Sequence, residues 1–219
     1  MRTQARAVVI GGGVVGVSTL YHLAKKGWSD SVLVERKELT SGSTWHAAGL
    51  LPLFNLSYSV GQIHKYSVAL YKRLGEETGL DVGFRQVSNI RLARTRDRLD
   101  EYNYYAGVAS TIGGIEVKLL TPDEVRQIWP LCETEGILGA IQHPEDGYIQ
   151  PADLTQALAR GARDNGADYT DRRSDLQIQD DGFVPGGILV TPRIGITKAA
   201  DHPARFILAG NPYVSGRKR

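Results

Sequence analysis

A glycine-rich turn between two apolar segments is the feature that most constrains the fold. The β-branched run Ala7–Ile10 ends at three consecutive glycines, residues 11–13, and a helical pattern of three- and four-residue spacing begins at Val14. A second apolar run, Ser31–Val34, ends at Glu35. Because such short connections require the two strands to be parallel, with the helix on one face, these residues predict a βαβ unit. We therefore expect an α/β fold with a parallel sheet.

The spacing of the glycines indicates what the turn binds. Gly11, Gly13 and Gly16 form the pattern G-x-G-x-x-G, and Glu35 stands nineteen residues after Gly16, at the end of the second strand. In a dinucleotide-binding unit one glycine makes the tight turn, the next lets the backbone approach a pyrophosphate, and the third lets helix and sheet pack closely. The helix start offers N–H groups and a positive dipole end to the phosphates, and the acid accepts from ribose hydroxyls. The segment thus predicts a dinucleotide cofactor.

Further helices and strands follow from the same kind of pattern. Helices are expected over residues 58–77, 96–112, 122–129 and 151–165, and strands over residues 83–94 and 137–142. Thr121 and Glu124 form a capping box, with Pro122 at the first helical position. After Gly166 the pattern breaks into short runs separated by glycine and proline, which favour turns and brief strands. This change predicts a boundary near residues 168–173.

Composition and charge narrow the class of protein. Apolar residues make up 42% and charged residues 23% of the 219, which is typical of a globular protein and excludes disordered and collagen-like chains. No apolar run approaches the roughly 20 residues that cross a bilayer, so no membrane partner is expected. Residues 1–6 precede no apolar stretch of signal-peptide length, and the single cysteine, Cys132, fits a reducing compartment. These features predict a cytoplasmic protein with no metal site.

Three stretches together resemble a known family. They are VVIGGGVVGVSTLYHLAKKGW (8–28), LVER (33–36) and GSTWHAAGL (42–50). They resemble the FAD-dependent dimethylglycine and sarcosine dehydrogenases of the glycine-oxidase-like flavoproteins. The resemblance continues through GFRQVSNIRLA (83–93), HPEDGYIQPADL (143–154) and ALARGARDNGA (157–167), and covers about residues 5–168.

The resemblance implies a cofactor and the residues that hold it. The cofactor is FAD, and His46 matches the histidine that this family joins covalently to the 8α carbon of the flavin. A neutral imidazole can act as a nucleophile there, and small residues on both sides let backbone amides approach a flat ring. The implied cofactor-binding residues are Gly11, Gly13, Val14, Val15, Gly16, Glu35, Arg36, Gly42, Ser43, Thr44, Trp45, His46, Ala47, Ala48, Gly49 and Leu50.

The resemblance also implies a reaction and a domain arrangement. The substrate would be a small N-methylated amine or amino acid, oxidised by hydride transfer to the histidyl-linked flavin. Residues 1–170 would form the oxidoreductase region, with FAD binding at about 5–80 and 150–168 and part of a mixed-sheet substrate domain at about 81–150. An Arg, Tyr or Lys of the sheet that covers the flavin would bind a substrate carboxylate. No catalytic residue, electron acceptor or particular amine can be named from the sequence.

The C-terminal segment has a different character. Residues 172–219 hold eight basic residues and four aspartates, net +4, whereas the residues before them have a net charge of −2. Residues 180–216 resemble the end of alkyladenine DNA glycosylases, with TPRIGI (191–196, including Arg193) and GNPYVS (210–215) as markers. Residues 206–210 also resemble a closing strand of a flavoprotein sheet, a likeness we ascribe to coincidence. We expect residues 171–219 to form a short irregular or β-rich tail.

Three rival interpretations remain open at this stage. The flavoprotein part is expected to be truncated, which could leave it inactive or dependent on a partner chain. Alternatively, the chain is a DNA-binding glycosylase fragment, with its basic tail in contact with nucleic acid, joined to a nonfunctional flavoprotein fragment. A nicotinamide-dependent dehydrogenase is a weaker alternative because it leaves the GSTWHAAGL stretch unexplained.

Overall fold

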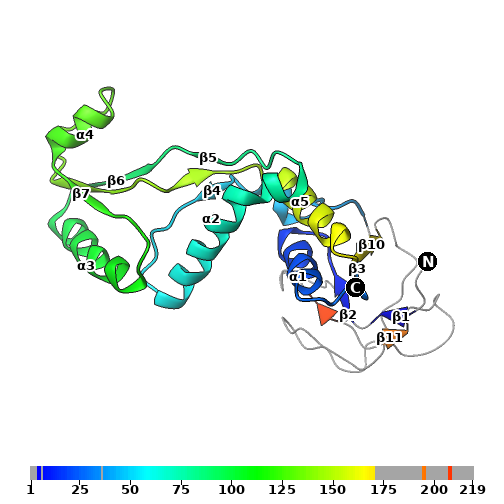
Figure 1. Ribbon diagram of the computed structural model, residues 1–219. Helices are drawn as coiled ribbons and strands as arrows, with labels where there is room; N and C mark the ends of the chain where they lie inside the picture. Colours follow the sequence, from blue (N-terminus) through cyan, green and yellow to red (C-terminus); the bar gives the residue numbers. More distant parts are fainter. Residues whose placement is uncertain (1–3, 6, 36, 171–193, 196–206, 209–219) are drawn as a thin grey trace, which may run out of the picture. The chain divides into compact units, whose positions relative to one another are not determined.

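The computed structural model describes residues 4–5, 7–35, 37–170, 194–195 and 207–208 (Figure 1). The chain divides into two compact units. The first unit contains the described residues among 1–48, 74–82 and 151–219, and the second contains residues 49–73 and 83–150. This division follows compactness alone, and the functional domains expected from the sequence stay predictions.

The first unit is built on a parallel sheet, so the predicted α/β class is confirmed. Its strands are β2 (Ala7–Ile10), β3 (Ser31–Val34), β10 (Asp168–Thr170) and β12 (Ile207–Leu208), in the order β10-β3-β2-β12. All three pairings are parallel. The first three residues of β2 are fully buried, as expected of a parallel strand covered on both faces.

Two helices cover this sheet beside each other. They are α1 (Val14–Lys25) and α5 (Pro151–Asp164), which pack together along their lengths (Figure 1). A Cβ at Gly161 would lie 2.8 Å from the Tyr21 ring, so the glycine allows the helices to approach closely. The bounds of β2, α1 and β3 match the predicted βαβ unit because their signals are local.

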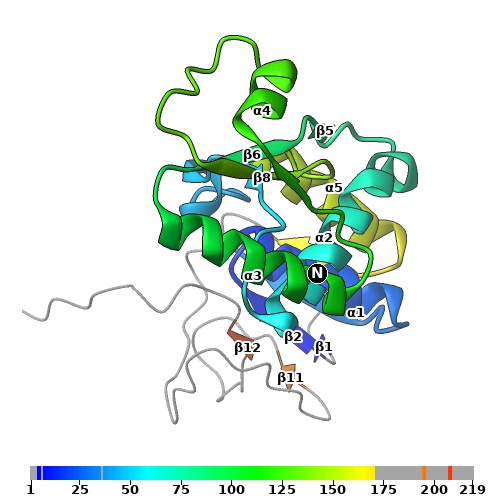
Figure 2. The ribbon, with the colours of Figure 1, turned by 90° about the vertical axis from the view of Figure 1, so that its left-hand side faces the viewer.

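The strand β12 corrects one expectation. The likeness of residues 206–210 to a closing sheet strand was ascribed to coincidence. Instead, Ile207 and Leu208 pair in parallel with Val9 and Ile10, so this piece of the C-terminal segment extends the sheet (Figure 2). A second piece, β11 (Ile194–Gly195), pairs antiparallel with β1 (Gln4–Ala5). Both pairings join positions far apart in the chain, which the sequence pattern does not reveal. Arg193 lies outside the described residues.

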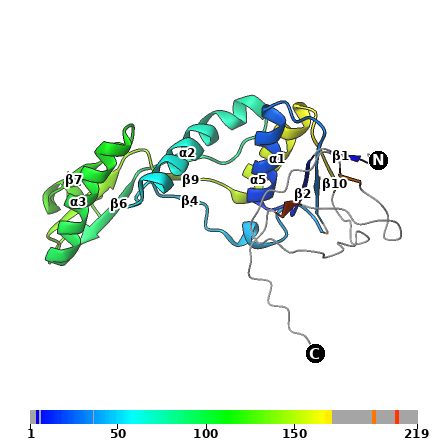
Figure 3. The same ribbon diagram turned by 90° about the horizontal axis from the view of Figure 1, so that it is seen from below.

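The second unit contains two antiparallel three-stranded sheets. One has the order β4-β9-β5, formed by β4 (Leu50–Leu51), β9 (Gly147–Tyr148) and β5 (Arg85–Gln86); β4 and β9 run side by side in Figure 3. The other has the order β6-β8-β7, formed by β6 (Asn89–Ala93), β8 (Gly139–His143) and β7 (Lys118–Leu120).

Helices complete the second unit and agree with the sequence patterns. They are α2 (Tyr58–Thr78), whose residues after Arg73 belong to the first unit, α3 (Arg96–Ile112) and α4 (Pro122–Ile128). The predicted capping box is present: the Glu124 amide donates to the Thr121 hydroxyl, and the Glu124 carboxylate accepts from the Thr121 amide. Over the described ranges, no helix is both long enough and apolar enough to span a bilayer.

The core of the second unit lies between α3 and the β6-β8-β7 sheet. Tyr102 and Tyr105 of α3 are buried, as their spacing predicts, whereas Tyr104 is exposed. The Tyr105 hydroxyl donates to the Leu53 carbonyl at 2.9 Å, and the Phe54 ring packs against both buried tyrosines. The segment that follows β4 is thereby fixed to the core.

Candidate cofactor site

The glycine turn between β2 and α1 is too tight for larger residues. Gly11 has a φ of 107°, a conformation that favours glycine, and its amide donates to the Val34 carbonyl at 2.9 Å. A Cβ at Gly16 would lie only 2.1 Å from the Gly11 carbonyl oxygen and 3.5 Å from the Val9 side chain. The predicted role of Gly16 in close packing of helix and strand is therefore visible in the geometry.

Glu35 is tied directly to this turn. Its Oε2 accepts from the Gly12 amide at 2.6 Å, and its Oε1 accepts from the Lys37 amide at 2.8 Å. A Cβ at Gly12 would lie 2.6 Å from Leu39 Cδ2 and 3.0 Å from Glu35 Cγ, so a larger residue there would have to displace these two side chains. Each carboxylate oxygen has more than one lone pair, so these bonds are compatible with a further hydroxyl donor. Sequence reasoning did not single out Gly12, although it stands within the triple glycine.

The start of α1 receives its cap from a distant residue. Gly13 occupies the N-cap and has no side chain to offer, and the Val14 amide donates instead to the hydroxyl of Thr44 at 3.0 Å. A Cβ at Gly13 would lie 3.1 Å from that same hydroxyl oxygen. The amides of Val15 and Gly16, in the first turn, have no acceptor within the helix. A helix start of this kind, at a turn without side chains, fits a diphosphate.

Thr44 belongs to the GSTWHAAGL stretch (42–50), and its bond to the Val14 amide brings that stretch to the start of α1. It is buried within a short 3₁₀ helix, η1 (Ser43–His46), whereas the side chains of Trp45 and His46 are exposed. The two rings lie 4.6 Å apart between centroids. His46 therefore stands two residues from the group that caps α1, with its imidazole accessible.

The other expected site residues are placed as follows. Val15 is 65% exposed at the first turn of α1, and Gly42, Ser43, Ala47 and Ala48 are exposed around η1. Gly49 and Leu50 belong to the second unit, where the Gly49 carbonyl accepts from the Ile149 amide at 2.9 Å. Arg36 lies outside the described residues. The first unit thus brings together Gly11, Gly13, Val14, Gly16, Glu35 and Thr44.

A buried polar cluster in the second unit was not expected from the sequence. His143 ends β8 with a fully buried side chain, and neither ring nitrogen has a hydrogen-bond partner among the described residues. Burial, together with the positive charge of Arg91, lowers the pKa of His143 to about 4. The imidazole is therefore neutral at pH 7.

Asp146, three residues later, is equally buried and holds three segments together. Its Oδ1 accepts from the Leu53 amide at 2.8 Å, and its main-chain carbonyl accepts from the amides of Val87 and Ser88. Burial raises the pKa of Asp146 to about 6, although the bond from Leu53 and the charge of Arg91 oppose the shift. The HPEDGYIQP stretch that contains both residues was the available signal, but it does not reveal their burial.

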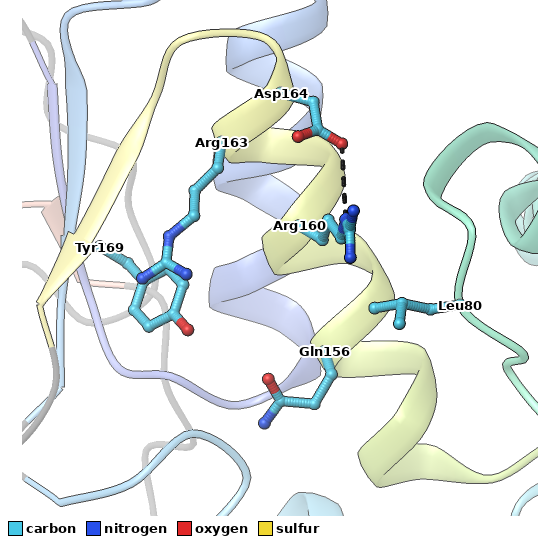
Figure 4. Close-up of a pocket in the computed structure, with 6 residues that line it drawn as sticks. All are labelled: Leu80, Gln156, Arg160, Arg163, Asp164 and Tyr169. Atoms are coloured by element: carbon cyan, nitrogen blue, oxygen red, sulfur yellow. Dashed lines mark ion pairs between the residues drawn. The ribbon is translucent and has the colours of Figure 1, made fainter.

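A surface pocket of about 380 Å³ lies elsewhere in the first unit, between α5, β10 and Leu80 (Figure 4). The Arg163 guanidinium stacks on the Tyr169 ring at 3.7 Å, and Arg160 faces Asp164 at 4.0 Å. Both arginines therefore have partners among the residues that line the pocket. Within the described ranges, no group of three or more His, Cys, Asp or Glu side chains could hold a metal ion.

The fold and the glycine turn define a dinucleotide-binding α/β protein. Comparison with known proteins makes this specific: the family model described as FAD dependent oxidoreductase (DAO) matches residues 6–218, and the chain belongs to this family. The match extends over the segment that resembles the glycosylases.

Two curated proteins are similar to this chain over three quarters of its length or more. The chain is 47% identical over 165 residues to mitochondrial dimethylglycine dehydrogenase of Rattus norvegicus, covering 75% of this chain and 19% of that protein. It is 36% identical over 187 residues to 4-methylaminobutanoate oxidase (formaldehyde-forming) of Paenarthrobacter nicotinovorans, covering 85% of this chain and 23% of that protein. The chain therefore spans about a fifth of the length of these relatives.

Among solved structures, L-proline dehydrogenase from P. horikoshii has the same fold. The two superpose with a TM-score of 0.73 at 27% sequence identity, over 82% of this chain and 48% of that chain. Because the matching family is that of the FAD dependent oxidoreductases, FAD is the cofactor expected for the glycine turn.

Proposed function

We propose that the chain forms the FAD-binding part of an oxidoreductase that acts on small N-methylated amines or amino acids, of the dimethylglycine and sarcosine type. The observation that carries this proposal is the glycine turn tied to Glu35, with the helix start capped by Thr44 beside an accessible His46. The names of the two curated relatives support the substrate class. When bound, FAD would supply the two-electron acceptor for oxidation of the amine.

The residues of this chain would bind and orient that cofactor. The amides at the start of α1 would hold the diphosphate, and Glu35 would accept from the adenosine ribose. The proposed FAD-binding regions are about 5–80 and 150–168, with part of the substrate domain at about 81–150. The compartment remains a prediction, since the rat relative is named as mitochondrial whereas the sequence features favour the cytoplasm.

We further propose that His46 attaches the flavin covalently. The imidazole of His46 would supply the nucleophilic nitrogen and give up its N–H proton. The flavin would supply the electrophilic 8α carbon, lose one C–H bond there, and take up the two protons and two electrons that the new bond releases. The exposure of His46 and its place in η1, next to the cap of α1, support this role.

The test is the fate of the yellow colour on denaturation. The 219-residue chain, purified with FAD, should keep its flavin absorbance after acid precipitation or in urea. His46→Ala should release the flavin under the same treatment, and His22→Ala, a change at another histidine of the first unit, should retain it. Colour lost by the unchanged chain would refute covalent attachment, and a chain that binds no flavin at all would refute the cofactor assignment.

The rival interpretation is DNA binding through the basic segment 172–219. It rests on the sequence resemblance to glycosylases, whereas the family match to residue 218 and the pairing of β12 with β2 favour a flavoprotein. A colourless protein that binds duplex DNA in a salt-dependent way would support the rival.

A further inference from the structure

The amide of Gly13 differs from the neighbouring amides of the glycine turn. The other amides among residues 11–14 donate to three acceptors, which are the Val34 carbonyl, the Glu35 carboxylate and the Thr44 hydroxyl. The Gly13 amide has no acceptor in the part of the chain that the structure describes. Because Gly13 is the N-cap of α1, its amide belongs to the open donors of the helix start. It is therefore available to a ligand.

The direction of this amide is set by the peptide that joins Gly12 to Gly13. In a trans peptide the carbonyl of the first residue and the N–H of the second point in opposite directions. The described residues contain no cis peptide bond. The Gly12 carbonyl accepts from the Thr40 amide at 2.9 Å. The N–H of Gly13 consequently points away from Thr40.

Thr40 has an unfavourable backbone conformation while it makes this bond. Its φ is 72°, in the left-handed region that β-branched residues rarely adopt. Such a conformation persists only where the surrounding structure enforces it, and it is concentrated at functional sites. Leu39, directly before Thr40, is buried, and its Cδ2 would lie 2.6 Å from a Cβ at Gly12. The Leu39 side chain and the Thr40 amide therefore both hold Gly12 in place.

We propose that Thr40 is a positioning residue for the cofactor: its amide holds the Gly12–Gly13 peptide in the orientation in which the Gly13 N–H donates to the FAD diphosphate. This inference rests on the proposed function, because it requires FAD at the glycine turn. Glu35 binds the amide of Gly12 and Thr40 binds its carbonyl, so the turn is fixed on both sides. A donor that is already oriented loses little freedom on binding, and its bond to a phosphate is charge-assisted.

The experiment removes the Thr40 N–H and leaves the side chain unchanged. In the 219-residue chain, Thr40 is replaced by its α-hydroxy acid analogue, so that an ester takes the place of the amide. His46→Ala is present in every protein, including the reference, so that FAD binds reversibly. Quenching of flavin fluorescence measures the dissociation constant. The ester at residue 40 should weaken FAD binding about tenfold or more, because the diphosphate loses an oriented, charge-assisted donor.

An ester at residue 41 is the matched control. The Ser41 amide donates to the Glu38 carbonyl at 3.2 Å, a bond in the same loop that does not involve the glycine turn. Each ester removes one main-chain hydrogen bond, so each should lower the melting temperature by about 2 to 4 °C. The ester at residue 41 should bind FAD within about twofold of the reference. Equal loss of FAD affinity in the two esters would mean that Thr40 has only a structural role, and it would overturn the proposal.

Thr40→Gly separates the effect of the amide from that of the side chain. Glycine keeps the N–H and adopts a positive φ without strain, so this variant should bind FAD within about threefold of the reference. A Thr40→Gly chain that loses as much FAD affinity as the ester at residue 40 would assign the effect to the threonine side chain, and the proposal would be wrong. Circular dichroism of each protein checks that the fold is preserved.

The outcomes also separate this inference from the proposed function. If the reference chain binds FAD and the ester at residue 40 binds it equally well, the Gly12–Gly13 peptide needs no support from Thr40, and this inference alone fails. If the reference chain binds no FAD, the cofactor assignment fails and this inference fails with it.

Discussion

The Glu35 carboxylate accepts a hydrogen bond of 2.6 Å from the Gly12 amide, which ties the end of β3 to the turn that follows β2. A second bond, from the Lys37 amide, occupies the other carboxylate oxygen. The acid at the strand end therefore helps to shape the glycine turn in addition to its proposed contact with a ribose.

Glu35→Gln tests that structural role. The amide group can offer only one acceptor oxygen, so one of the two main-chain donors would face an NH₂ group. We expect a loss of about 1 to 2 kcal/mol in the free energy of unfolding, measured by urea titration. Glu76→Gln, at an exposed position of α2, is the control and should stay within about 0.5 kcal/mol. Equal stability of the two variants would contradict the role.

Gly16→Ala should prevent the helix and the turn from packing. The added Cβ would lie 2.1 Å from the Gly11 carbonyl oxygen, a backbone atom that can move only with the turn. We expect a loss of about 2 kcal/mol or more in stability, together with loss of flavin retention. Gly107→Ala in α3 is the matched control: apart from the neighbouring backbone of the helix, no described atom lies within 4 Å of its Cβ position, and it should stabilise the protein by about 0.5 to 1 kcal/mol. A stable, yellow Gly16→Ala protein would show that the turn is looser than described.

Thr44→Val should uncap α1 with little change in shape. The Val14 amide would lose its acceptor at 3.0 Å, and we expect thermal unfolding to report about 1 kcal/mol of lost stability. Thr44→Ser keeps the hydroxyl and should retain most of the stability. If the Thr44→Val and Thr44→Ser variants are equally stable, the hydroxyl is not the cap that the geometry indicates.

The contributions of Asp146 and His143 to the stability of the fold should change in opposite directions with pH. Because the folded-state pKa of Asp146 is raised to about 6, its contribution to stability grows as the pH falls through 6 and is lost as the pH rises through it. Because the folded-state pKa of His143 is lowered to about 4, its contribution is present above pH 6.5 and is lost as the pH falls towards 4. Arg91 acts on both groups, and Glu145 and the Tyr105 phenol face Asp146.

Single variants should separate the two contributions. Relative to the unchanged chain, Asp146→Asn should lose on the order of 1 kcal/mol more stability between pH 7 and pH 5, because only the His143 effect is left. His143→Phe should lose on the order of 2 kcal/mol less over the same range. Urea titrations at both pH values measure the differences. Parallel pH profiles for all three proteins would contradict the burial of these groups.

Local signals in the sequence were sufficient for the βαβ unit and for most helices. The strand before the glycines, the turn and the stop at Gly27 act within a few residues, and the capping box at Thr121 does the same. The family resemblance was needed to predict that the GSTWHAAGL stretch (42–50) contacts the flavin. The family match supports FAD as the cofactor.

Contacts between distant residues were beyond the reach of the pattern. The cap from Thr44 to Val14 joins positions 30 apart, and the bond from Leu53 to Asp146 joins positions 93 apart. Periodicity places neither pair together, nor does it indicate that β12 pairs with β2. The burial of His143 was missed for the same reason, since β8 is covered by side chains from α3 and from the segment after β4.

The place of β9 in the chain also sets the order in which the strands of the β4-β9-β5 sheet can pair during synthesis. Among the strands of the described residues, β4 and β5 pair only with β9, which the ribosome releases some sixty residues after β5. Both strands therefore stay unpaired until the HPEDGYIQP stretch has been synthesised. Closing loops of that length slows folding. Substitutions in this stretch should lower the yield of folded protein in cells more than they lower the stability of molecules that have already folded.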